Sequence, residues 1–446
     1  MTSAKDAGPG LRAVLSTFDL TMIAVGGTIG SGIFLTPSLV AGQLQTPGMI
    51  LGIWVVGGII TLCGALSFAE LGGMMPRAGG MYAYLTESYG SLAGFLFGWA
   101  YLLVVNTGGI AALSLAFATY LGYFIPLDPQ ETQLTAILGL AIVTSLNIRG
   151  ARAGGTFADL FTILKLLGLA FLIVVGLGWG TREIVDASEH LPASPLNLTG
   201  AFAIAMVGVL WSFGGWQHAS FSAAEAKDAA RSVPRAMVSG AIIVTTVYLL
   251  ANLAYLFILS PEEMGVSQRV ASDAMEKILG PFGGTLIALF IFTSTFGSTG
   301  IYTLTAPRIY YAMAQDGLFF RKVAQLHPRF HTPIFAILLQ SSWALVLILF
   351  WGTFNELISY VVFTDWVFFG LTAAGVFVLR RRMPTANRPY KTLGYPFTPA
   401  LFVGSAAWFV LNTLIEKPLQ AWAGLGFLAM GIPVYFFWKR RSGIRT

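Results

Sequence analysis

The stretch Phe18-Asp-Leu-Thr-Met-Ile-Ala-Val-Gly-Gly-Thr-Ile-Gly-Ser-Gly-Ile-Phe34 places four glycines in the middle of an apolar run. A second apolar run contains Trp211-Ser-Phe-Gly-Gly-Trp-Gln217, again with glycines at its centre. Glycine costs about 1 kcal/mol relative to alanine inside a helix, so both runs are predicted to unwind locally. Close helix packing through small residues is the alternative interpretation. Paired interruptions in two halves of a chain are typical of a transport site between broken helices, and we favour that interpretation.

Composition places both runs in a membrane. Of the 446 residues, 56% are hydrophobic and 10% are charged, whereas a soluble domain carries about 25% charged residues. Apolar runs of this length recur along the chain, and each can cross about 30 Å of hydrocarbon as a helix. Continuous runs do not match the short alternating strands of a membrane β-barrel. An all-α polytopic membrane protein is therefore predicted.

Twelve membrane-crossing helices are expected from these runs, at residues 18–40, 48–72, 91–122, 133–148, 156–178, 199–223, 235–259, 282–306, 333–352, 356–380, 398–415 and 419–438. Residues 1–17 are expected to form a cytoplasmic tail and residues 18–178 a first repeat of five helices. Residues 199–380 are expected to form a second, inverted repeat of five helices, and residues 381–446 the last two helices and a basic cytoplasmic C-terminus. No cleavable signal pattern precedes the first run, which is expected to stay as a helix.

Basic residues indicate the orientation. With both termini in the cytoplasm, 21 of the 26 Lys and Arg residues fall on the inside, four fall outside and one, Lys165, lies within a helix. This bias follows the positive-inside rule and predicts a multi-pass protein of the cytoplasmic membrane. The basic loops do not argue for nucleic acid. A single cysteine, Cys63, excludes an intrachain disulfide, and neither a metal site nor a cofactor is predicted.

The broken helices suggest a ligand. A half-helix that begins near Ser31 would point free amide groups and a positive dipole end at an anion such as a carboxylate. Half-helices that end near Ile29 and Phe213 would offer free carbonyls to an ammonium group. Adjacent anion and cation sites of this kind fit an α-amino acid. No nucleophile–base pair or metal cluster indicates an enzyme.

Five stretches carry a family resemblance, in order along nearly the whole chain. They are Gly27-Thr-Ile-Gly-Ser-Gly-Ile-Phe34, Phe68-Ala-Glu-Leu-Gly-Gly-Met-Met-Pro-Arg-Ala-Gly-Gly-Met-Tyr82, Phe213-Gly-Gly-Trp216, Ala306-Pro-Arg-Ile-Tyr-Tyr-Ala-Met-Ala-Gln-Asp-Gly317 and Arg388-Pro-Tyr-Lys-Thr-Leu-Gly-Tyr-Pro396. Together they resemble the amino acid–polyamine–organocation transporters, in particular the L-type amino acid branch and its bacterial permease relatives.

The resemblance implies a LeuT-type five-plus-five inverted repeat and alternating access. It implies substrate contacts from the two breaks and an aromatic gate at Trp211, with the substrate residues at Ile29, Gly30, Ser31, Gly32, Trp211, Phe213, Gly214, Gly215 and Gln217. Animal relatives are tied to a heavy chain through an extracellular cysteine. This chain has none there, so no disulfide-linked heavy chain is expected.

Lys165 is the only basic residue deep within a predicted helix, and an intramembrane charge is a functional hypothesis by default. Snorkelling of its long side chain to the interface is the alternative. In sodium-independent transporters that this chain resembles, a lysine at this position stands where other members bind sodium. By that resemblance, Lys165 would connect the unwound part of the first helix to the eighth, near Ser294 or Ser298.

Four further polar residues are candidates for a place on the substrate pathway: Asn106, Thr107, His218 and Asp365. For His218, a hydrogen-bonded core histidine is the favoured interpretation. Asp365 faces either the external pathway or the interior of the bundle. At the inner loops, Glu70 and Arg77 are candidates for an ion pair, and solvation of both at the membrane interface is the alternative.

The resulting functional hypothesis is a sodium-independent exchanger or facilitator of neutral L-amino acids. The alternatives are a proton-coupled symporter of amino acids and a transporter of cationic amino acids or polyamines. The preferred amino acid stays open.

Overall fold

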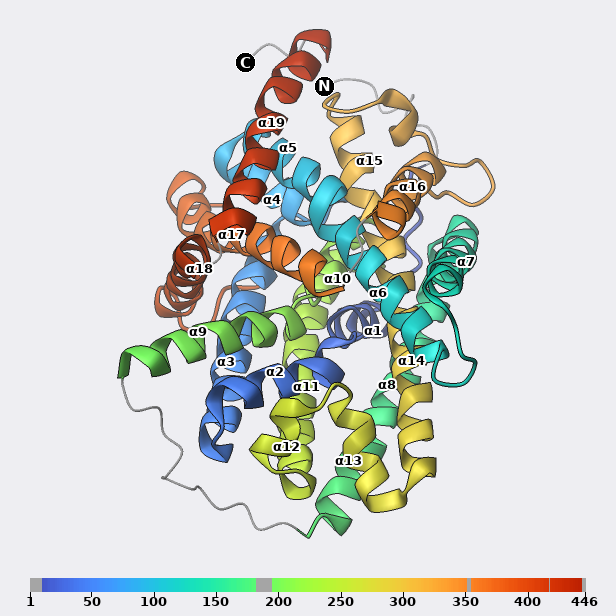
Figure 1. Cartoon of the computed structure of the whole chain (residues 1–446). Helices are drawn as coiled ribbons and strands as arrows, with labels where there is room; N and C mark the ends of the chain where they lie inside the picture. Colours follow the sequence, from blue (N-terminus) through green and yellow to red (C-terminus); the bar gives the residue numbers. More distant parts are fainter. Residues whose placement is uncertain (1–9, 182–194, 351–353, 417, 443–446) are drawn as a thin grey trace.

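The computed structural model describes residues 10–181, 195–350, 354–416 and 418–442, and within these ranges it contains helices and no β-strand (Figure 1). Ten of its helices are long and apolar enough to cross a membrane. Two shorter apolar helices, Leu198–Ser212 and Ile334–Phe350, lie at the sixth and ninth predicted crossings. The all-α prediction is therefore confirmed, while the count of twelve crossings stays a prediction.

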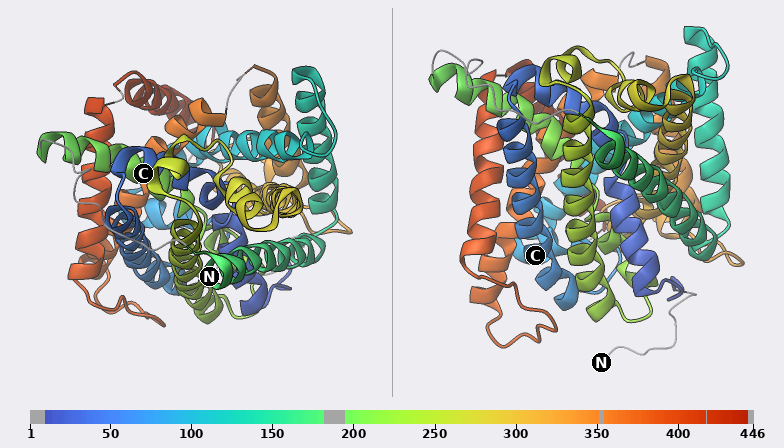
Figure 2. Two further views of the ribbon diagram at one scale, coloured as in Figure 1. Left: turned by 60° about the horizontal axis from the view of Figure 1, so that its bottom comes forward. Right: turned by 90° about the horizontal axis from the view of Figure 1, so that it is seen from below.

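In chain order the elements are α1 (Thr17–Thr28), α2 (Gly32–Leu44), α3 (Pro47–Met74), α4 (Met81–Tyr89), α5 (Ser91–Ala100), the π-helix η1 (Tyr101–Val105), α6 (Asn106–Leu121), α7 (Pro129–Ile148), α8 (Ala151–Trp179), α9 (Pro195–Ser212), α10 (His218–Phe221), the 3₁₀ turn η3 (Ala223–Glu225), α11 (Ala229–Ile258), α12 (Pro261–Val266), α13 (Val270–Leu279), α14 (Pro281–Thr305), α15 (Pro307–Gln315), the 3₁₀ turn η4 (Arg321–Ala324), α16 (Ile334–Phe350), α17 (Phe354–Arg382), α18 (Phe397–Glu416) and α19 (Pro418–Ser442). The right-hand view of Figure 2 shows most of the long helices running in roughly one direction.

Three predicted spans differ from the expectation in their division or bounds. The span 199–223 is interrupted at its glycines as predicted, but α9 ends at Ser212 and only the short α10 follows, so the part after the glycines is shorter than expected. The third span, 91–122, is one apolar stretch but changes to π-helix between α5 and α6. The fourth begins earlier than predicted, at Pro129, because the side chain of Asp128 caps its first turn.

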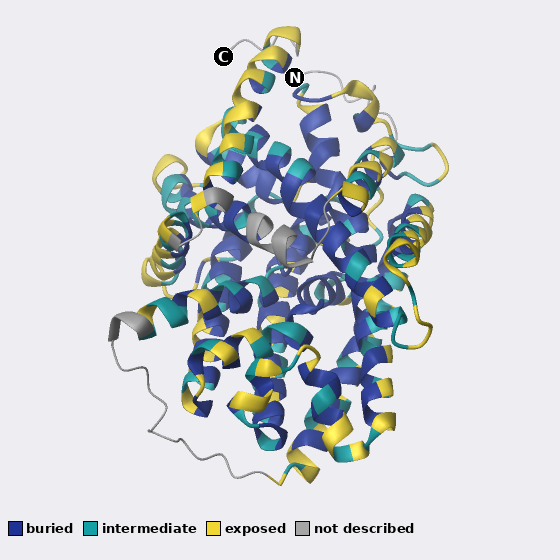
Figure 3. Cartoon of the chain, in the orientation of Figure 1, coloured by how far each residue is buried: buried dark blue, intermediate teal, exposed yellow. Residues whose placement is uncertain are grey.

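Helix α1 lies near the centre of the bundle and the apolar surface faces outward. Figure 3 shows buried residues concentrated on the central helices and exposed ones on outer helices such as α7 and α19. The exposed positions of α7 include Leu134, Leu138 and Ile142. Large apolar side chains on an outer face suit contact with lipid, so the centre of the bundle is the place where polar groups need internal partners.

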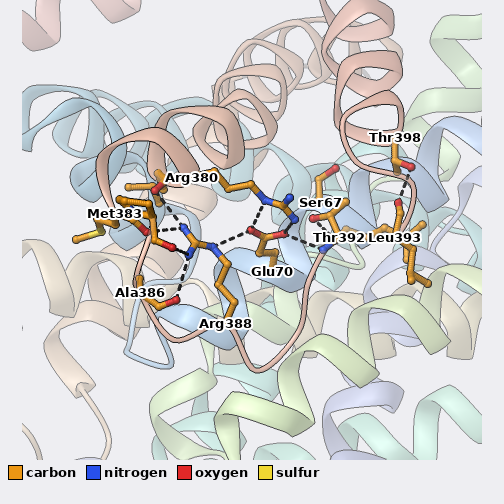
Figure 4. Close-up of polar contacts among 12 residues, drawn as sticks. Ser67, Glu70, Arg380, Met383, Ala386, Arg388, Thr392, Leu393 and Thr398 are labelled. Atoms are coloured by element: carbon orange, nitrogen blue, oxygen red, sulfur yellow. Dashed lines mark hydrogen bonds and ion pairs between the residues drawn. The ribbon is translucent and has the colours of Figure 1, made fainter.

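A buried carboxylate joins α3 to α17 and to the loop before α18. Glu70 is 1% exposed and accepts two hydrogen bonds from Arg380, at 2.9 and 2.6 Å (Figure 4). Its other partners are Arg388, at 3.2 Å, and the backbone amide of Thr392, at 2.8 Å. The predicted pairing of Glu70 with Arg77 is therefore wrong. Arg77 is exposed and instead contacts Glu87 of α4 at 3.4 Å, whereas Glu70 is buried against Arg380.

Candidate functional site

The first helix is interrupted at the predicted place. Helix α1 ends at Thr28 and α2 begins at Gly32, with Ile29, Gly30 and Ser31 between them. The hydroxyl of Ser31 is buried and has no hydrogen-bond partner among the described residues. The first amides of α2 have no partner within their own helix, and they carry the positive end of its dipole. This end of α2 can therefore receive an anionic group.

The second break packs directly against the first. Gly215 has a φ of 130°, which side chains rarely adopt, and a Cβ added there would lie 2.3 Å from the carbonyl oxygen of Gly27. Gln217 supports this turn, since its Oε1 accepts a hydrogen bond of 2.9 Å from the amide of Gly215. The two glycine-containing breaks are therefore in direct contact and form one structural unit.

Replacing Gly215 with alanine is expected to separate the two breaks and to reduce transport strongly. The added methyl group meets backbone, which cannot rotate away, and it also forces an L-residue into a positive φ. Gly52→Ala in α3 is the matched control, because a Cβ at Gly52 meets nothing within 4 Å. Thermal stability and uptake of both purified variants are the measurements. Equal transport by the Gly215 variant and the control would contradict the packing argument.

Lys165 of α8 reaches the first break instead of the interface. It is fully buried, and its ammonium donates to the carbonyl oxygens of Gly26, at 2.8 Å, and Ile29, at 2.7 Å, and to the hydroxyl of Ser298, at 2.7 Å. An ammonium has three protons, so all three are used. The negative end of the α1 dipole lies at the same place and favours a cation. The snorkelling alternative does not apply.

Ser294 and Ser298 of α14 complete this cluster, as the resemblance implied. The hydroxyl of Ser298 lies 2.9 Å from the carbonyl oxygen of Gly26, and that of Ser294 lies 3.3 Å from that of Gly30. Both hydroxyls also approach the carbonyl oxygen of Ile29, at 3.1 and 3.4 Å. Lys165 and the two serines therefore surround the Ile29 carbonyl, so a substrate amino group would have to share this oxygen with them, and its predicted role in binding stays a prediction.

Tyr248 of α11 contacts the carbonyl ends of both half-helices. Its buried hydroxyl lies 3.1 Å from the carbonyl oxygen of Thr28 and 2.9 Å from that of Ser212. One side chain therefore joins the end of α1 to the end of α9. This role was not predicted, because an aromatic residue in an apolar helix has no distinctive local pattern.

A small cavity of about 20 Å³ lies beside the second break. Trp211, Gly214 and Gln217 line it from the break, and Asp365 and Trp366 line it from α17. Tyr101, Tyr302 and Phe369 are among the aromatic residues that complete its wall. The described lining includes no residue of α1 or α2. A volume of this size admits about one water molecule, so a complete amino acid would require the surrounding helices to move.

Known proteins are similar to this chain over nearly its whole length. A model of the family described as "Amino acid permease" matches residues 15–437. The chain belongs to the amino acid permease family. The serine/threonine exchanger SteT of Bacillus subtilis is 33% identical over 428 residues, which cover 95% of this chain and 96% of the relative. The mouse large neutral amino acids transporter small subunit 2 is 33% identical, with 98% and 84% covered. The human Asc-type amino acid transporter 1 is 32% identical, with 97% and 84% covered.

Family membership confirms the resemblance to the amino acid–polyamine–organocation transporters. The permease is a multi-pass membrane transport protein rather than an enzyme, and its family implies an amino acid as the substrate.

Three of the predicted pathway residues of the permease are held by internal contacts. His218 lies 2.5 Å from the hydroxyl of Thr305 and 3.3 Å from that of Tyr101, which is the arrangement of a hydrogen-bonded core histidine. Asn106 donates to Gln340 at 3.1 Å, and Thr107 donates to the carbonyl oxygen of Leu102 at 2.7 Å, within the π-helical turn. The cavity lining includes Asp365 but none of these three.

Proposed function

We propose that this permease exchanges neutral L-amino acids across the cytoplasmic membrane by alternating access and without sodium. The observation that carries the proposal is the position of Lys165. Carbonyl and hydroxyl oxygens of this kind are ligands for a hard cation. Here the ammonium of Lys165 makes hydrogen bonds of 2.7–2.8 Å to three of them. A cation that belongs to the protein leaves no need for a bound metal ion to stabilise the break.

The substrate is proposed to bind across the two breaks. Its carboxylate would accept hydrogen bonds from the amides of Ser31 and Gly32, where α2 begins. Its ammonium would meet carbonyls of the second break around Phe213, because the Ile29 carbonyl is occupied by Lys165. Gly30, Gly214 and Gly215 allow the backbone to approach the substrate closely, since a glycine has no side chain in the way.

Trp211 is proposed as the gate and Gln217 as a polar contact. Both line the cavity at the second break, and Trp211 is half-buried there. The narrowness of the cavity supports a state in which aromatic side chains fill the space beside the breaks. Rotation of Trp211 would then enlarge the cavity enough for an amino acid.

The topology is proposed to comprise twelve crossings in a LeuT-type five-plus-five repeat, with both termini in the cytoplasm. The two breaks, which occupy corresponding positions in residues 18–178 and 199–380, support the repeat. The bias of basic residues supports the orientation. No disulfide-linked heavy chain is proposed, since the only cysteine of the sequence, Cys63, lies within α3.

Exchange is tested with purified protein in liposomes and sodium-free buffer. Uptake of labelled serine, threonine, alanine and leucine is measured with and without unlabelled amino acid inside. We expect internal substrate to accelerate uptake several-fold and added sodium to leave it unchanged. Equal uptake into empty liposomes would point to a facilitator, and accumulation driven by a pH gradient would point to a proton symporter. Absence of uptake for every neutral amino acid would contradict the proposal.

A further inference from the structure

We propose that a groove on the outer face of α19 binds an anionic phospholipid of the cytoplasmic leaflet. The inference rests on the proposed orientation, which places the C-terminal end of α19 at the cytoplasmic surface. The groove has a volume of about 760 Å³, is open to the surroundings, and is lined by Pro433, Phe436, Phe437, Arg440 and Arg441. All of them belong to α19, so this groove is separate from the cavity beside the second break.

The residues that line the groove share one face of the helix. They lie at positions 433, 436, 437, 440 and 441, and residues three or four positions apart are neighbours on a helix surface. The groove begins at Pro433 inside the helix, where a proline removes a backbone hydrogen bond and bends the helix. Its wall changes from apolar to cationic toward the C-terminal end. This order matches a phospholipid, whose acyl chains lie deeper in the bilayer than its phosphate.

The groove faces away from the rest of the protein. Phe436 and Phe437 are 49% and 58% exposed, and both arginines are exposed as well. The opposite face of α19 packs inward, because Tyr435 and Trp438 are only 3% and 8% exposed. Figure 3 shows α19 at the outside of the bundle. The outward face of an outer helix contacts lipid in a membrane, so a lipid molecule is the occupant that fits this groove.

The two arginines select an anionic lipid by charge complementarity. Within the described part of the chain, neither Arg440 nor Arg441 takes part in an ion pair. Arg441 lies over the ring of Trp438, 5.8 Å from its centre, which leaves its guanidinium protons available. A guanidinium binds a phosphate group through two parallel hydrogen bonds. A zwitterionic headgroup would also bring a cation close to the arginines, which repel it.

A neighbouring segment adds positive charge to the same surface. Phe320 packs edge-on against Trp438, with ring centres 4.8 Å apart, so the turn η4 lies beside the end of α19. This turn begins with Arg321 and Lys322, which are both exposed. The acid closest to them in sequence, Asp316, already accepts a hydrogen bond of 2.7 Å from a tyrosine hydroxyl. Basic clusters at the cytoplasmic end of a membrane helix attract anionic lipids.

Binding is tested on the purified full chain in mixed micelles of detergent and lipid. The unfolding temperature is measured while phosphatidylglycerol replaces phosphatidylcholine at constant total lipid. We expect phosphatidylglycerol to raise the unfolding temperature until the groove is saturated, and soluble glycerol phosphate to leave it unchanged. An absence of any difference between the two lipids, or an equal effect of glycerol phosphate, would overturn the inference. Amino acid exchange is measured separately, so a failure of lipid binding leaves the proposed function intact.

Two matched variants distinguish the groove from general positive charge. Arg440→Gln with Arg441→Gln is expected to raise the half-saturating fraction of phosphatidylglycerol at least about tenfold, since each basic residue near an anionic lipid contributes to binding. Arg149→Gln with Arg152→Gln is the control, because it removes the same charge from exposed positions between α7 and α8. Its half-saturating fraction should stay within about twofold of the unmodified value. Equal shifts in both variants would overturn the groove as a site.

A third variant changes the apolar wall and keeps both charges. Phe437→Ala removes an exposed ring from the groove, so phosphatidylglycerol is expected to bind at least about threefold more weakly, because less apolar surface is covered. This variant also decides the inference if the Arg440 and Arg441 variant does not fold. An unchanged half-saturating fraction for Phe437→Ala would show that the acyl chains do not occupy the groove.

Discussion

Replacing Lys165 with methionine is expected to reduce amino acid exchange at least about 100-fold. Methionine keeps most of the volume but donates none of the three hydrogen bonds to Gly26, Ile29 and Ser298. A hydrogen bond from a charged group contributes about 1.5–3 kcal/mol, and a loss of about 2.7 kcal/mol already corresponds to a factor of 100. Without these bonds, the carbonyls that end α1 lose the cation that orients them. Initial rates of exchange in liposomes measure the effect.

Lys277→Met provides the control for the loss of a lysine. Lys277 lies on the surface, about half exposed, in a salt bridge with Glu263, and such pairs contribute about 0–1 kcal/mol. Exchange by this variant should match that of the unmodified protein. Exchange by Lys165→Met at a comparable rate, with equal amounts of folded protein in the membrane, would remove Lys165 from the mechanism.

Replacing Arg308 with alanine is expected to destabilise the fold by about 3–5 kcal/mol, the range for breaking a buried ion pair. Arg308 and Glu225 are 0% and 1% exposed and form two parallel hydrogen bonds of 2.7 and 2.8 Å. Loss of the arginine leaves a carboxylate buried without its partner. The backbone of Glu225 also accepts hydrogen bonds of 2.8 Å from Val14 and Leu15, so the segment before α1 would loosen as well.

The loss of stability is measured as thermal unfolding, monitored by size-exclusion chromatography of samples heated to increasing temperatures. Arg77→Ala is the control, because its pair with Glu87 is exposed and 3.4 Å long. Its cost should be about 1 kcal/mol or less. The double variant Glu225→Gln with Arg308→Met should recover much of the loss, since no unpaired charge remains. A double variant as unstable as Arg308→Ala would show that packing, and not the ion pair, explains the result.

The places of the breaks could be predicted from local sequence, and their contacts could not. Glycines at 26–32 and at 214–215 weaken the helix wherever they occur, so the interruptions after Thr28 and Ser212 follow from the residues at those positions. The occupation of the Ile29 carbonyl by Lys165 could not be predicted in this way, because the two residues are 136 positions apart. Whether a carbonyl is free for a substrate depends on the helix that packs beside it.

The wrongly predicted ion pair of Glu70 shows the same limit of prediction from local sequence. Glu70 and Arg77 are neighbours in sequence, yet Glu70 binds Arg380, 310 positions away. Charge complementarity alone allows many pairings, and only the packing of α3 against α17 selects one of them. Tyr248 likewise has no distinctive sequence context, although it contacts the ends of α1 and α9.

The sequence by itself determined that this protein is an α-helical membrane permease with two interrupted helices, because hydropathy, glycine clusters and ordered motifs act locally along the chain. Only the tertiary structure decided which groups meet at those interruptions. It placed Tyr248 across both breaks and Asp365 in the cavity beside the second, and it fixed which carbonyl oxygens the ammonium of Lys165 contacts at the first. The physical reason is that a helix presents its side chains in every direction, and the rotation and packing of each helix in the bundle select the ones that reach the site.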